Sequence, residues 1–389
     1  MNSYLKVNSN LSTAFLFIIL FFAPIYKYCE NVLFFPRVNI TILYILILLG
    51  VVLYNTYHIE KKSKEGVWIS FGLLLMISLI QIVSYPWAIT YMSYGTHNYL
   101  TIISKTMIQA WLFWFTGLYI EEIFKKERFW KFLLFLWLIF SCIIINNAIY
   151  NTSFLILLNG NQIYLMLADS FAMLSIFILC KNRNYQIQFL IIILSIICLF
   201  ALWSRASLYC YMLTILFFLF KNRNIYLGII VILFSIFVYT NDNIISLADN
   251  RMIRMLYGGY DASQSMRSQQ LNQGIQDLKE VWFLGSFMGD IEKNFGLRGE
   301  YIHNHLSFWR QYGFIPFIIF VSLIISIMYK SIAYWMFEKN QKEVPLFLFY
   351  FSIFCISEII LARSYVFPYV WLSISGISSY FYYHKKENN

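Results

Sequence analysis

The stretch VNITILYILILLGVVLYNTY, residues 38–57, decides the fold class of this chain, because none of its side chains carries a charge. A second stretch, Ile187–Trp203, reads IQFLIIILSIICLFALW and has the same character. An α-helix needs about 20 predominantly apolar residues to cross the hydrocarbon core of a bilayer. Both stretches therefore predict transmembrane helices.

Composition extends this prediction to the whole chain. Of the 389 residues, 60% are hydrophobic and 12% are charged, whereas soluble domains average about 45–50% and about 25%. One soluble core could not bury so much apolar surface. We predict an all-α, polytopic membrane helix bundle of about 12 transmembrane helices. The first apolar run, Leu11–Pro24, follows a single lysine and lacks a small-residue cleavage site, so we expect a retained helix and not a signal peptide.

Lysine and arginine positions set the expected orientation. The predicted spans are roughly residues 11–29, 38–57, 67–86, 100–120, 129–148, 163–180, 187–203, 206–220, 225–240, 313–333, 345–362 and 366–383. Basic residues such as Lys61 and Lys62 gather in the connectors on one side of these spans. By the positive-inside rule, both termini are cytoplasmic. We predict an N-terminal transmembrane bundle of about nine helices over 1–240, an outward-facing loop over 241–312, and C-terminal transmembrane helices over 313–389.

Several classes of protein are disfavoured. The net charge of +10 lies mostly in short loops beside predicted helices, where it sets topology, so we expect no nucleic-acid partner. The six cysteines are scattered, and no pair has metal-ligand spacing. We interpret them as small hydrophobic residues. The chain has no glycine-rich phosphate-binding loop, which argues against an ATP-driven transporter.

The turn Ser204-Arg205 lies between two apolar runs, at the outward-facing end of both. An arginine at that depth is costly without a counter-charge. Two interpretations stay open. The guanidinium either snorkels to lipid phosphates or binds an anionic ligand, since its planar fork suits phosphate oxygens.

The outward-facing loop contains a predicted amphipathic helix, which follows the potential capping residues of Asp261-Ala-Ser263. Its apolar residues recur at helical spacing: Met266, Leu271, Ile275, Leu278 and Trp282. We expect this helix at the outer surface of the membrane or over the mouth of the bundle. Arg267 falls in its expected first turn, where the helix dipole disfavours a cation. Arg267 therefore either binds an anion or is a solvated charge.

A glycine-punctuated turn and two histidines follow this helix. The turn reads Trp282-Phe-Leu-Gly285-Ser-Phe-Met-Gly289, and Tyr301-Ile-His303-Asn304-His305 leads into the next predicted span. A histidine can act as a base near neutral pH, and Asn304 can orient it or a sugar hydroxyl. The alternatives are two structural histidines or a zinc site, although a third ligand of suitable spacing is missing.

Together these features resemble the O-antigen polymerase and O-antigen ligase superfamily, over roughly residues 187–330 in motifs and over the whole chain in hydropathy. Enzymes of this superfamily act outside the cytoplasmic membrane on glycans carried by undecaprenyl diphosphate. The resemblance implies that Arg205 and Arg267 grip the diphosphate and that His303 is the general base or orienting residue. The remaining candidates are expected to bind substrate: Ser204, Arg254, Asn304 and His305.

The resemblance implies a glycosyltransferase of the bacterial inner membrane, with its site facing the periplasm. It would polymerise undecaprenyl-diphosphate-linked O-antigen or related surface-polysaccharide repeat units. An O-antigen ligase, which passes glycan to the lipid A core, is the first alternative, and a flippase-like polysaccharide exporter is the second. We expect no metal and no other cofactor. The expected partners are the undecaprenyl-diphosphate-linked oligosaccharide and membrane lipids, and the resemblance leaves room for a chain-length regulator.

Four further ionisable residues lie at membrane depth, within the predicted spans or at the end of one, where such residues are candidates for function. They are Lys105, Asp169, Glu358 and Arg363. Glu358 and Arg363 are close in sequence near an outward-facing end, and we predict a structural ion pair between them. We assign no role to Lys105 or Asp169.

Overall fold

A computed structural model gives the three-dimensional structure of the chain. It describes residues 2–32, 35–36, 40–55, 65–86, 103–150, 163–202, 204–222, 262–293, 302–337 and 342–387. Every regular element in these ranges is a helix, and no strand occurs among them. The predicted all-α fold class is confirmed for this part of the chain.

The chain divides into two compact units. Unit 1 consists of Met1–Phe15, Asn39–Lys125 and Ser265–Asn389, and unit 2 consists of Leu16–Val38 and Lys126–Gln264. Each unit is therefore assembled from segments that are distant in sequence. The predicted three-part division concerns position relative to a membrane, and it stays a prediction.

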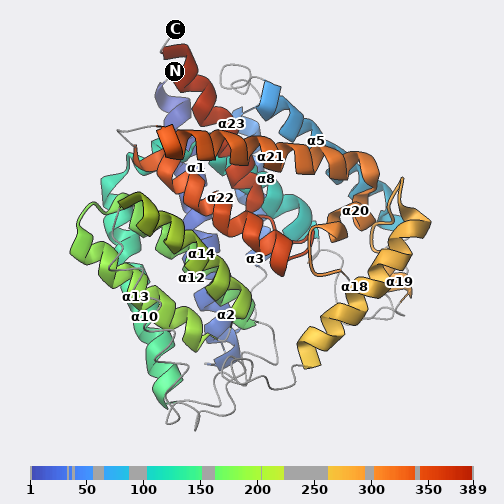
Figure 1. The fold of residues 1–389 in the computed structure, drawn as a ribbon. Helices are drawn as coiled ribbons and strands as arrows, with labels where there is room; N and C mark the ends of the chain where they lie inside the picture. Colours follow the sequence, from blue (N-terminus) through green and yellow to red (C-terminus); the bar gives the residue numbers. More distant parts are fainter. Residues whose placement is uncertain are drawn as a thin grey trace. The chain divides into compact units, whose positions relative to one another are not determined.

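Unit 1 has its closest helix packing where α8 meets α23. Its elements are most of α1 (Asn2–Phe17), then α3 (Ile40–Asn55), α5 (Glu65–Val83), the π-helix η2 (Ser104–Ile108), α8 (Gln109–Leu118), α9 (Ile120–Phe124), α18 (Ala262–Val281), α19 (Gly289–Lys293), α20 (Leu306–Tyr312), α21 (Phe314–Phe337), α22 (Glu343–Leu361) and α23 (Val370–Glu387) (Figure 1). A Cβ atom added at Gly117 of α8 would lie 2.0 Å from Ser375 Oγ and 2.5 Å from the carbonyl oxygen of Leu372, both on α23. Small residues allow helix backbones to approach this closely, a common mode of packing in membranes.

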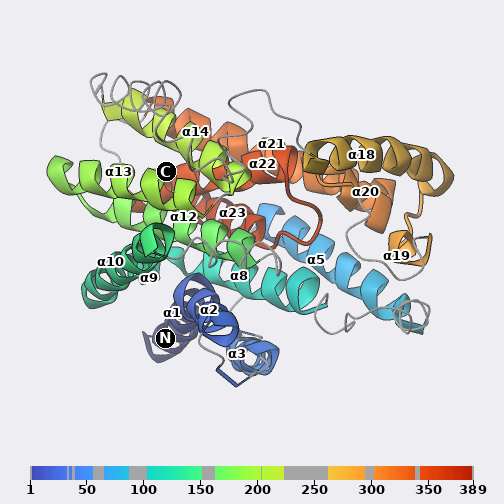
Figure 2. The same cartoon turned by 90° about the horizontal axis from the view of Figure 1, so that it is seen from below.

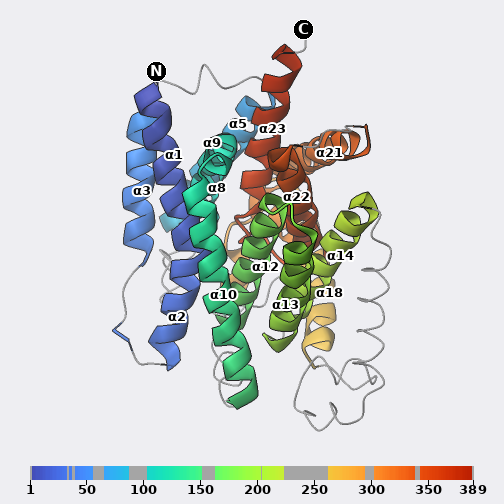
Figure 3. The same cartoon turned by 90° about the vertical axis from the view of Figure 1, so that its left-hand side faces the viewer.

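Unit 2 is built around α12. Its elements are η1 (Ile18–Phe22), α2 (Ala23–Val32), α10 (Glu127–Tyr150), α12 (Ile163–Lys181), α13 (Tyr185–Ala201) and α14 (Arg205–Asn222), and Figure 3 shows α10, α12 and α13 side by side. Trp137 of α10 is fully buried, and its Nε1 donates a hydrogen bond of 2.8 Å to Ser175 Oγ of α12. The Trp137 ring also stacks on Phe171. The hydrogen bond satisfies the indole N–H inside an apolar core.

Five of the described helices are long and apolar enough to cross a membrane. They are Ser9–Glu30, Glu127–Ala148, Tyr164–Lys181, Phe314–Phe337 and Glu343–Leu361. Three shorter apolar helices accompany them, Ile40–Val52, Val67–Val83 and Tyr185–Ala201. The predicted ninth span, 225–240, lies outside the described residues. The total of about twelve spans and the orientation of the chain stay predictions.

Candidate functional site

The described part of residues 241–312, the loop predicted to face outward, folds into three helices that gather at one end of α21 (Figures 1 and 2). α18 is the long predicted helix, α19 is a single short helix, and α20 leads directly into α21. The turn over residues 282–288 joins α18 to α19. All three helices belong to unit 1 from Ser265 onward, so the contacts among them can be followed residue by residue.

Two glycines bring the turn after α18 against the junction between α20 and α21. Gly285 has φ +71° and Gly313 has φ +86°, in the left-handed region that glycine adopts without strain. A Cβ atom at Gly285 would lie 2.3 Å from the backbone nitrogen of Gly313. The Ser286 N–H donates to the Arg310 carbonyl at 2.8 Å, and the Phe314 N–H donates to the Phe283 carbonyl at 3.0 Å. The turn is thus fixed to the start of α21.

A buried polar cluster lies beside this glycine contact. Arg310 is 2% exposed, and its Nη1 lies 3.0 Å from the Ser286 carbonyl and 3.2 Å from Asp290 Oδ1. Gln311 Nε2 donates to the same Asp290 oxygen at 2.9 Å, and Gln311 Oε1 accepts from the Met288 N–H at 2.7 Å. Met288 has φ +61°, a strained conformation for a residue with a side chain. The cluster pairs its buried charges and holds the backbone at Met288.

Sequence reasoning missed this cluster. Asp290 and Arg310 are separated by nineteen residues, and the only sequence signal was their position in the polar loop. They meet because Gly285 and Gly313 fold the chain back on itself. A second, partly exposed ion cluster is formed by Lys293. Its Nζ lies 2.8 Å from Asp277 Oδ1 and 2.6 Å from Glu280 Oε2. Hydrogen bonds to Asp277 and Glu280 raise the pKa of Lys293.

The helix α18 is confirmed, but its buried face differs from the predicted apolar stripe. Gln270, Gly274 and Leu278 are buried, whereas Ile275 and Trp282 are 38% and 52% exposed. The reason is a tertiary contact. A Cβ atom at Gly274 would lie 2.1 Å from Ile302 Cγ1, so the missing side chain admits Ile302 to this face.

Arg267 also lies differently from the prediction. It is the sixth residue of α18, in the second turn, and it is partly exposed. The helix dipole acts mainly within the first turn, so the expected conflict between Arg267 and the dipole does not apply. Asp261 lies outside the described residues, and so does Arg254.

The histidine motif forms a bend followed by the first turn of α20. His303 and Asn304 are both partly exposed. Asn304 Oδ1 accepts from the Leu306 N–H at 2.9 Å, and the Asn304 carbonyl accepts from Ser307 Oγ at 2.7 Å. Asn304 therefore forms a turn that satisfies the N–H of Leu306, the first residue of α20, while His305 holds the N-cap position. The amide oxygen that was expected to orient His303 or a sugar hydroxyl is engaged with the backbone of the helix.

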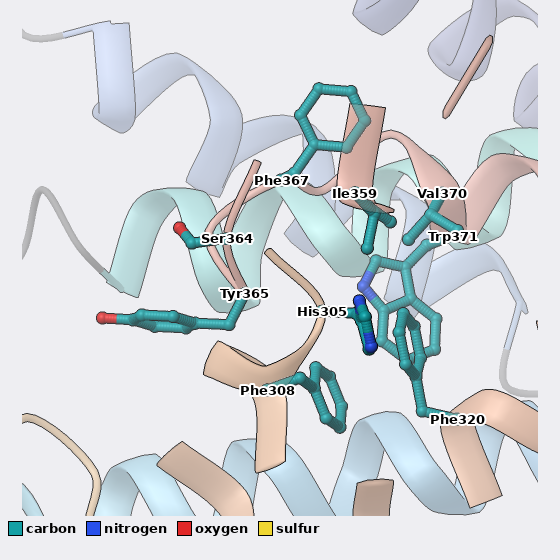
Figure 4. Close-up of a pocket in the computed structure, with 9 residues that line it drawn as sticks. All are labelled: His305, Phe308, Phe320, Ile359, Ser364, Tyr365, Phe367, Val370 and Trp371. Atoms are coloured by element: carbon teal, nitrogen blue, oxygen red, sulfur yellow. The ribbon is translucent and has the colours of Figure 1, made fainter. Parts of the chain in front are cut away.

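His305 lies in a small aromatic cavity (Figure 4). The cavity is lined by residues of α20 to α23 and the loop after α22: His305, Phe308, Phe320, Ile359, Ser364, Tyr365, Phe367, Val370 and Trp371. The His305 ring also stacks on Phe317. Burial lowers the pKa of His305, because a charged imidazole would lose its hydration. Its Nδ1 has no hydrogen-bond partner among the described residues, and the cavity that His305 lines has room for about one water molecule.

Ser204 belongs to a buried hydrogen-bond chain in unit 2. Its Oγ lies 2.7 Å from Ser207 Oγ, and Ser207 Oγ donates to Asp169 Oδ1 at 2.6 Å. All three side chains are at most 6% exposed. The Ser204 carbonyl accepts the Leu208 N–H at 3.0 Å, so Ser204 opens α14. Asp169, which sequence reasoning left without a role, thus anchors the residue that precedes Arg205.

Arg205 is the first residue of α14 and is partly exposed. It and Ser204 belong to unit 2, whereas Arg267, His303 and His305 belong to unit 1. The structure brings the latter three onto neighbouring elements of one unit. The predicted meeting of Arg205 with His303 stays a prediction.

The predicted ion pair at the end of α22 is confirmed. Arg363 Nε lies 3.2 Å from Glu358 Oε2, and the Glu358 side chain is fully buried. The Arg363 N–H also donates to the Glu358 carbonyl at 2.7 Å. The pair holds the end of α22 at the start of the loop that carries Ser364 and Tyr365 of the His305 cavity.

Comparison with protein families, with curated proteins and with solved structures finds no match to this chain.

Proposed function

We propose that the chain is an inner-membrane glycosyltransferase that polymerises undecaprenyl-diphosphate-linked repeat units of O-antigen or a related surface polysaccharide on the periplasmic face. The observation that carries the proposal is the contact between Gly274 of α18 and Ile302, the residue that precedes His303. Arg267 stands seven residues before Gly274, so the two share one face of the helix and are about 10 Å apart along its axis. Arg267 and His303 therefore lie on adjoining elements.

This arrangement suits glycosyl transfer from a lipid diphosphate. The acceptor hydroxyl oxygen attacks the anomeric carbon, the bond from that carbon to the diphosphate oxygen breaks, and undecaprenyl diphosphate leaves with the electron pair. His303 takes the hydroxyl proton. Arg267 and Arg205 stabilise the negative charge that develops on the diphosphate. The guanidinium suits this task because its planar fork matches phosphate oxygens.

The lipopolysaccharide banding pattern of a deletion strain tests the proposal. Loss of the ladder with a single repeat unit kept on the core is the result expected of a polymerase. Loss of every repeat unit would instead indicate a ligase or an exporter and would contradict the proposal. Restoring the ladder with the full-length chain ties the phenotype to this protein.

Variants in the complemented strain test the residues. We expect His303→Ala to reduce the rate of polymer formation roughly 10²–10⁴-fold, the usual span for a positioned general base. His305→Ala is the matched comparison and should be milder. Arg267→Ala should nearly abolish polymer, whereas Arg267→Lys should restore part of it, because lysine keeps the charge but loses the two-pronged geometry. A full ladder in both His303→Ala and Arg267→Ala would remove these residues from the mechanism.

A further inference from the structure

Three consecutive large apolar side chains are exposed at the turn that follows α18. Trp282 is 52% exposed, Phe283 is 48% exposed and Leu284 is 79% exposed. Over residues 267–281, the part of α18 whose side chains the structure describes, the exposed positions are polar except for Ile275. Exposed apolar surface of this kind, rimmed by polar residues, commonly marks a place of contact with a membrane or a partner. We call residues 282–284 the apolar tip.

The apolar tip is firmly attached to the beginning of α21. The Trp282 carbonyl accepts from Trp309 Nε1 at 2.6 Å, and the Phe283 carbonyl accepts from the Phe314 N–H at 3.0 Å. The Trp282 and Phe314 rings are also in edge contact. The backbone of the tip is thus held, while its side chains project outward.

The helix to which the tip is attached has an apolar exposed face. α21 is one of the candidate membrane spans, and only 33% of its most apolar window is buried inside the structure. Its exposed residues recur three and four apart on one face of the helix, at Ile315, Ile318, Ser322, Ile325 and Tyr329. Such a face in a spanning helix meets lipid. Ile315 and Ile318 stand within the first two turns, close in sequence to the Phe314 contact with the tip.

We propose that the apolar tip inserts into the outward-facing leaflet of the membrane, where it contacts the acyl chains of bilayer lipids. The tip continues the lipid-facing surface of α21 onto the polar loop. Tryptophan suits the boundary because its ring is apolar and its N–H is polar, which favours the headgroup level. The insertion holds α18 and α20, with Arg267 and His303, at the membrane surface. It does not depend on the proposed glycosyltransferase activity.

A nitroxide spin label at residue 284 tests the proposal. The full-length chain, with its six native cysteines replaced by alanine, carries Leu284→Cys and is reconstituted into phosphatidylethanolamine–phosphatidylglycerol nanodiscs. Power saturation then compares collisions with oxygen, which concentrates in the bilayer, and with a water-soluble nickel chelate. Ile318→Cys on α21 provides the lipid reference, and Gln269→Cys on α18 provides the aqueous reference.

We expect the label at residue 284 to favour oxygen over the nickel chelate by a ratio near that of residue 318 and several-fold above that of residue 269. A ratio like that of residue 269 would show that the tip lies in water and would overturn the proposal. Low accessibility to both reagents would show that protein covers the tip, which also overturns it. An oxygen preference that arises only after addition of undecaprenyl diphosphate would assign the surface to a polyprenyl chain instead of bilayer lipids. Phe283→Cys, labelled in the same way, repeats the measurement if Leu284→Cys fails to fold.

Discussion

The guanidinium of Arg310 lies 3.2 Å from the carboxylate of Asp290, and the two side chains are only 3% and 6% exposed. Both charges are removed from water, and each is satisfied mainly by the other and by neighbouring polar groups. In a buried pair, removal of one partner leaves the other charge uncompensated. The pair also joins the start of α19 to α20, so it fixes the elements on both sides of the glycine contact.

We predict that Asp290→Ala lowers the free energy of unfolding by up to about 3–5 kcal/mol, because it leaves the buried Arg310 with only the Asp277 carboxylate, whose Oδ2 lies 3.6 Å from Arg310 Nη2. The double variant Asp290→Leu with Arg310→Met should recover much of this loss, since it removes both charges. Lys293→Met is the control, because Lys293 is 45% exposed in its ion pairs, and exposed pairs contribute at most about 1 kcal/mol. The measurement is unfolding in detergent by denaturant titration. Equal losses for Asp290→Ala and Lys293→Met would contradict the prediction.

The glycine contact gives a second prediction. Gly285→Ala should displace the turn from α21 and strongly reduce thermal stability, because the added Cβ atom would lie 2.3 Å from the Gly313 nitrogen and the residue would keep φ +71°. Gly72→Ala in α5 is the matched control, since no atom lies within 4 Å of its added Cβ. Size-exclusion chromatography after heating measures both variants. If Gly285→Ala were as stable as Gly72→Ala, the turn would not need the close backbone approach.

These two sites show which parts of the structure the sequence predicts and which it does not. Residues 38–57 predict a helix because a long uncharged apolar run is a local property, and α3 spans Ile40–Asn55. The Glu358–Arg363 pair was also predictable, because its members are close in sequence at a helix end. The Asp290–Arg310 pair was not, because its members meet only through a turn set by two glycines with positive φ.

The helix α18 was also predictable from the sequence, whereas the contact on its buried face was not. Helical periodicity predicted the helix itself, which spans Ala262–Val281. Periodicity placed Ile275 on the apolar face of the helix, but inside the protein the helix buries Gly274, and Ile275 is exposed. The contact partner, Ile302, lies far along the chain, and a glycine carries no hydropathy signal for such a contact. The motifs identified candidate catalytic residues, but they did not identify the distant residues whose contacts hold those candidates in place.

The His305 cavity gives a prediction for pH. Burial lowers the pKa of His305 in the folded protein, while an unfolded histidine titrates near pH ~6.5. As pH falls below that value, the unfolded state takes up a proton that the folded state resists, so the free energy of unfolding decreases. Thermal unfolding should therefore occur at lower temperature at pH 5.5 than at pH 7.5. His305→Phe should reduce this difference, because phenylalanine can stack on Phe317 without titrating.

The variant His303→Gln is the control for the pH difference between the unchanged protein and His305→Phe. His303→Gln should leave the part of the pH difference that His305 contributes, because the buried imidazole is still present. At pH 7.5, His305→Phe should have a stability close to that of the unchanged protein, which would show that the cavity accepts the ring. An identical pH difference in the unchanged protein and in His305→Phe would mean that His305 is not the group responsible.

The hydrogen-bond chain in unit 2 gives the last prediction. Ser207 Oγ donates its hydrogen to Asp169 Oδ1, so in the contact between the two hydroxyls Ser204 donates and Ser207 accepts. Ser207→Ala breaks the chain and leaves buried polar atoms of Ser204 and Asp169 without this partner, which should lower the free energy of unfolding by about 1–3 kcal/mol. Ser352→Ala is the matched control, because this fully buried hydroxyl bonds only within its own helix, to the Leu348 carbonyl at 2.6 Å.

Asp169→Asn should be milder than Ser207→Ala, since the amide oxygen can still accept from Ser207. The chain also holds Ser204, which precedes Arg205, so the proposed polymer formation should fall in Ser207→Ala at temperatures where the protein stays folded. Full polymer formation by a destabilised Ser207→Ala would limit the hydrogen-bond chain to a role in stability. Equal stabilities of Ser207→Ala and Ser352→Ala would show that the hydrogen-bond chain does not stabilise the fold more than a bond within one helix.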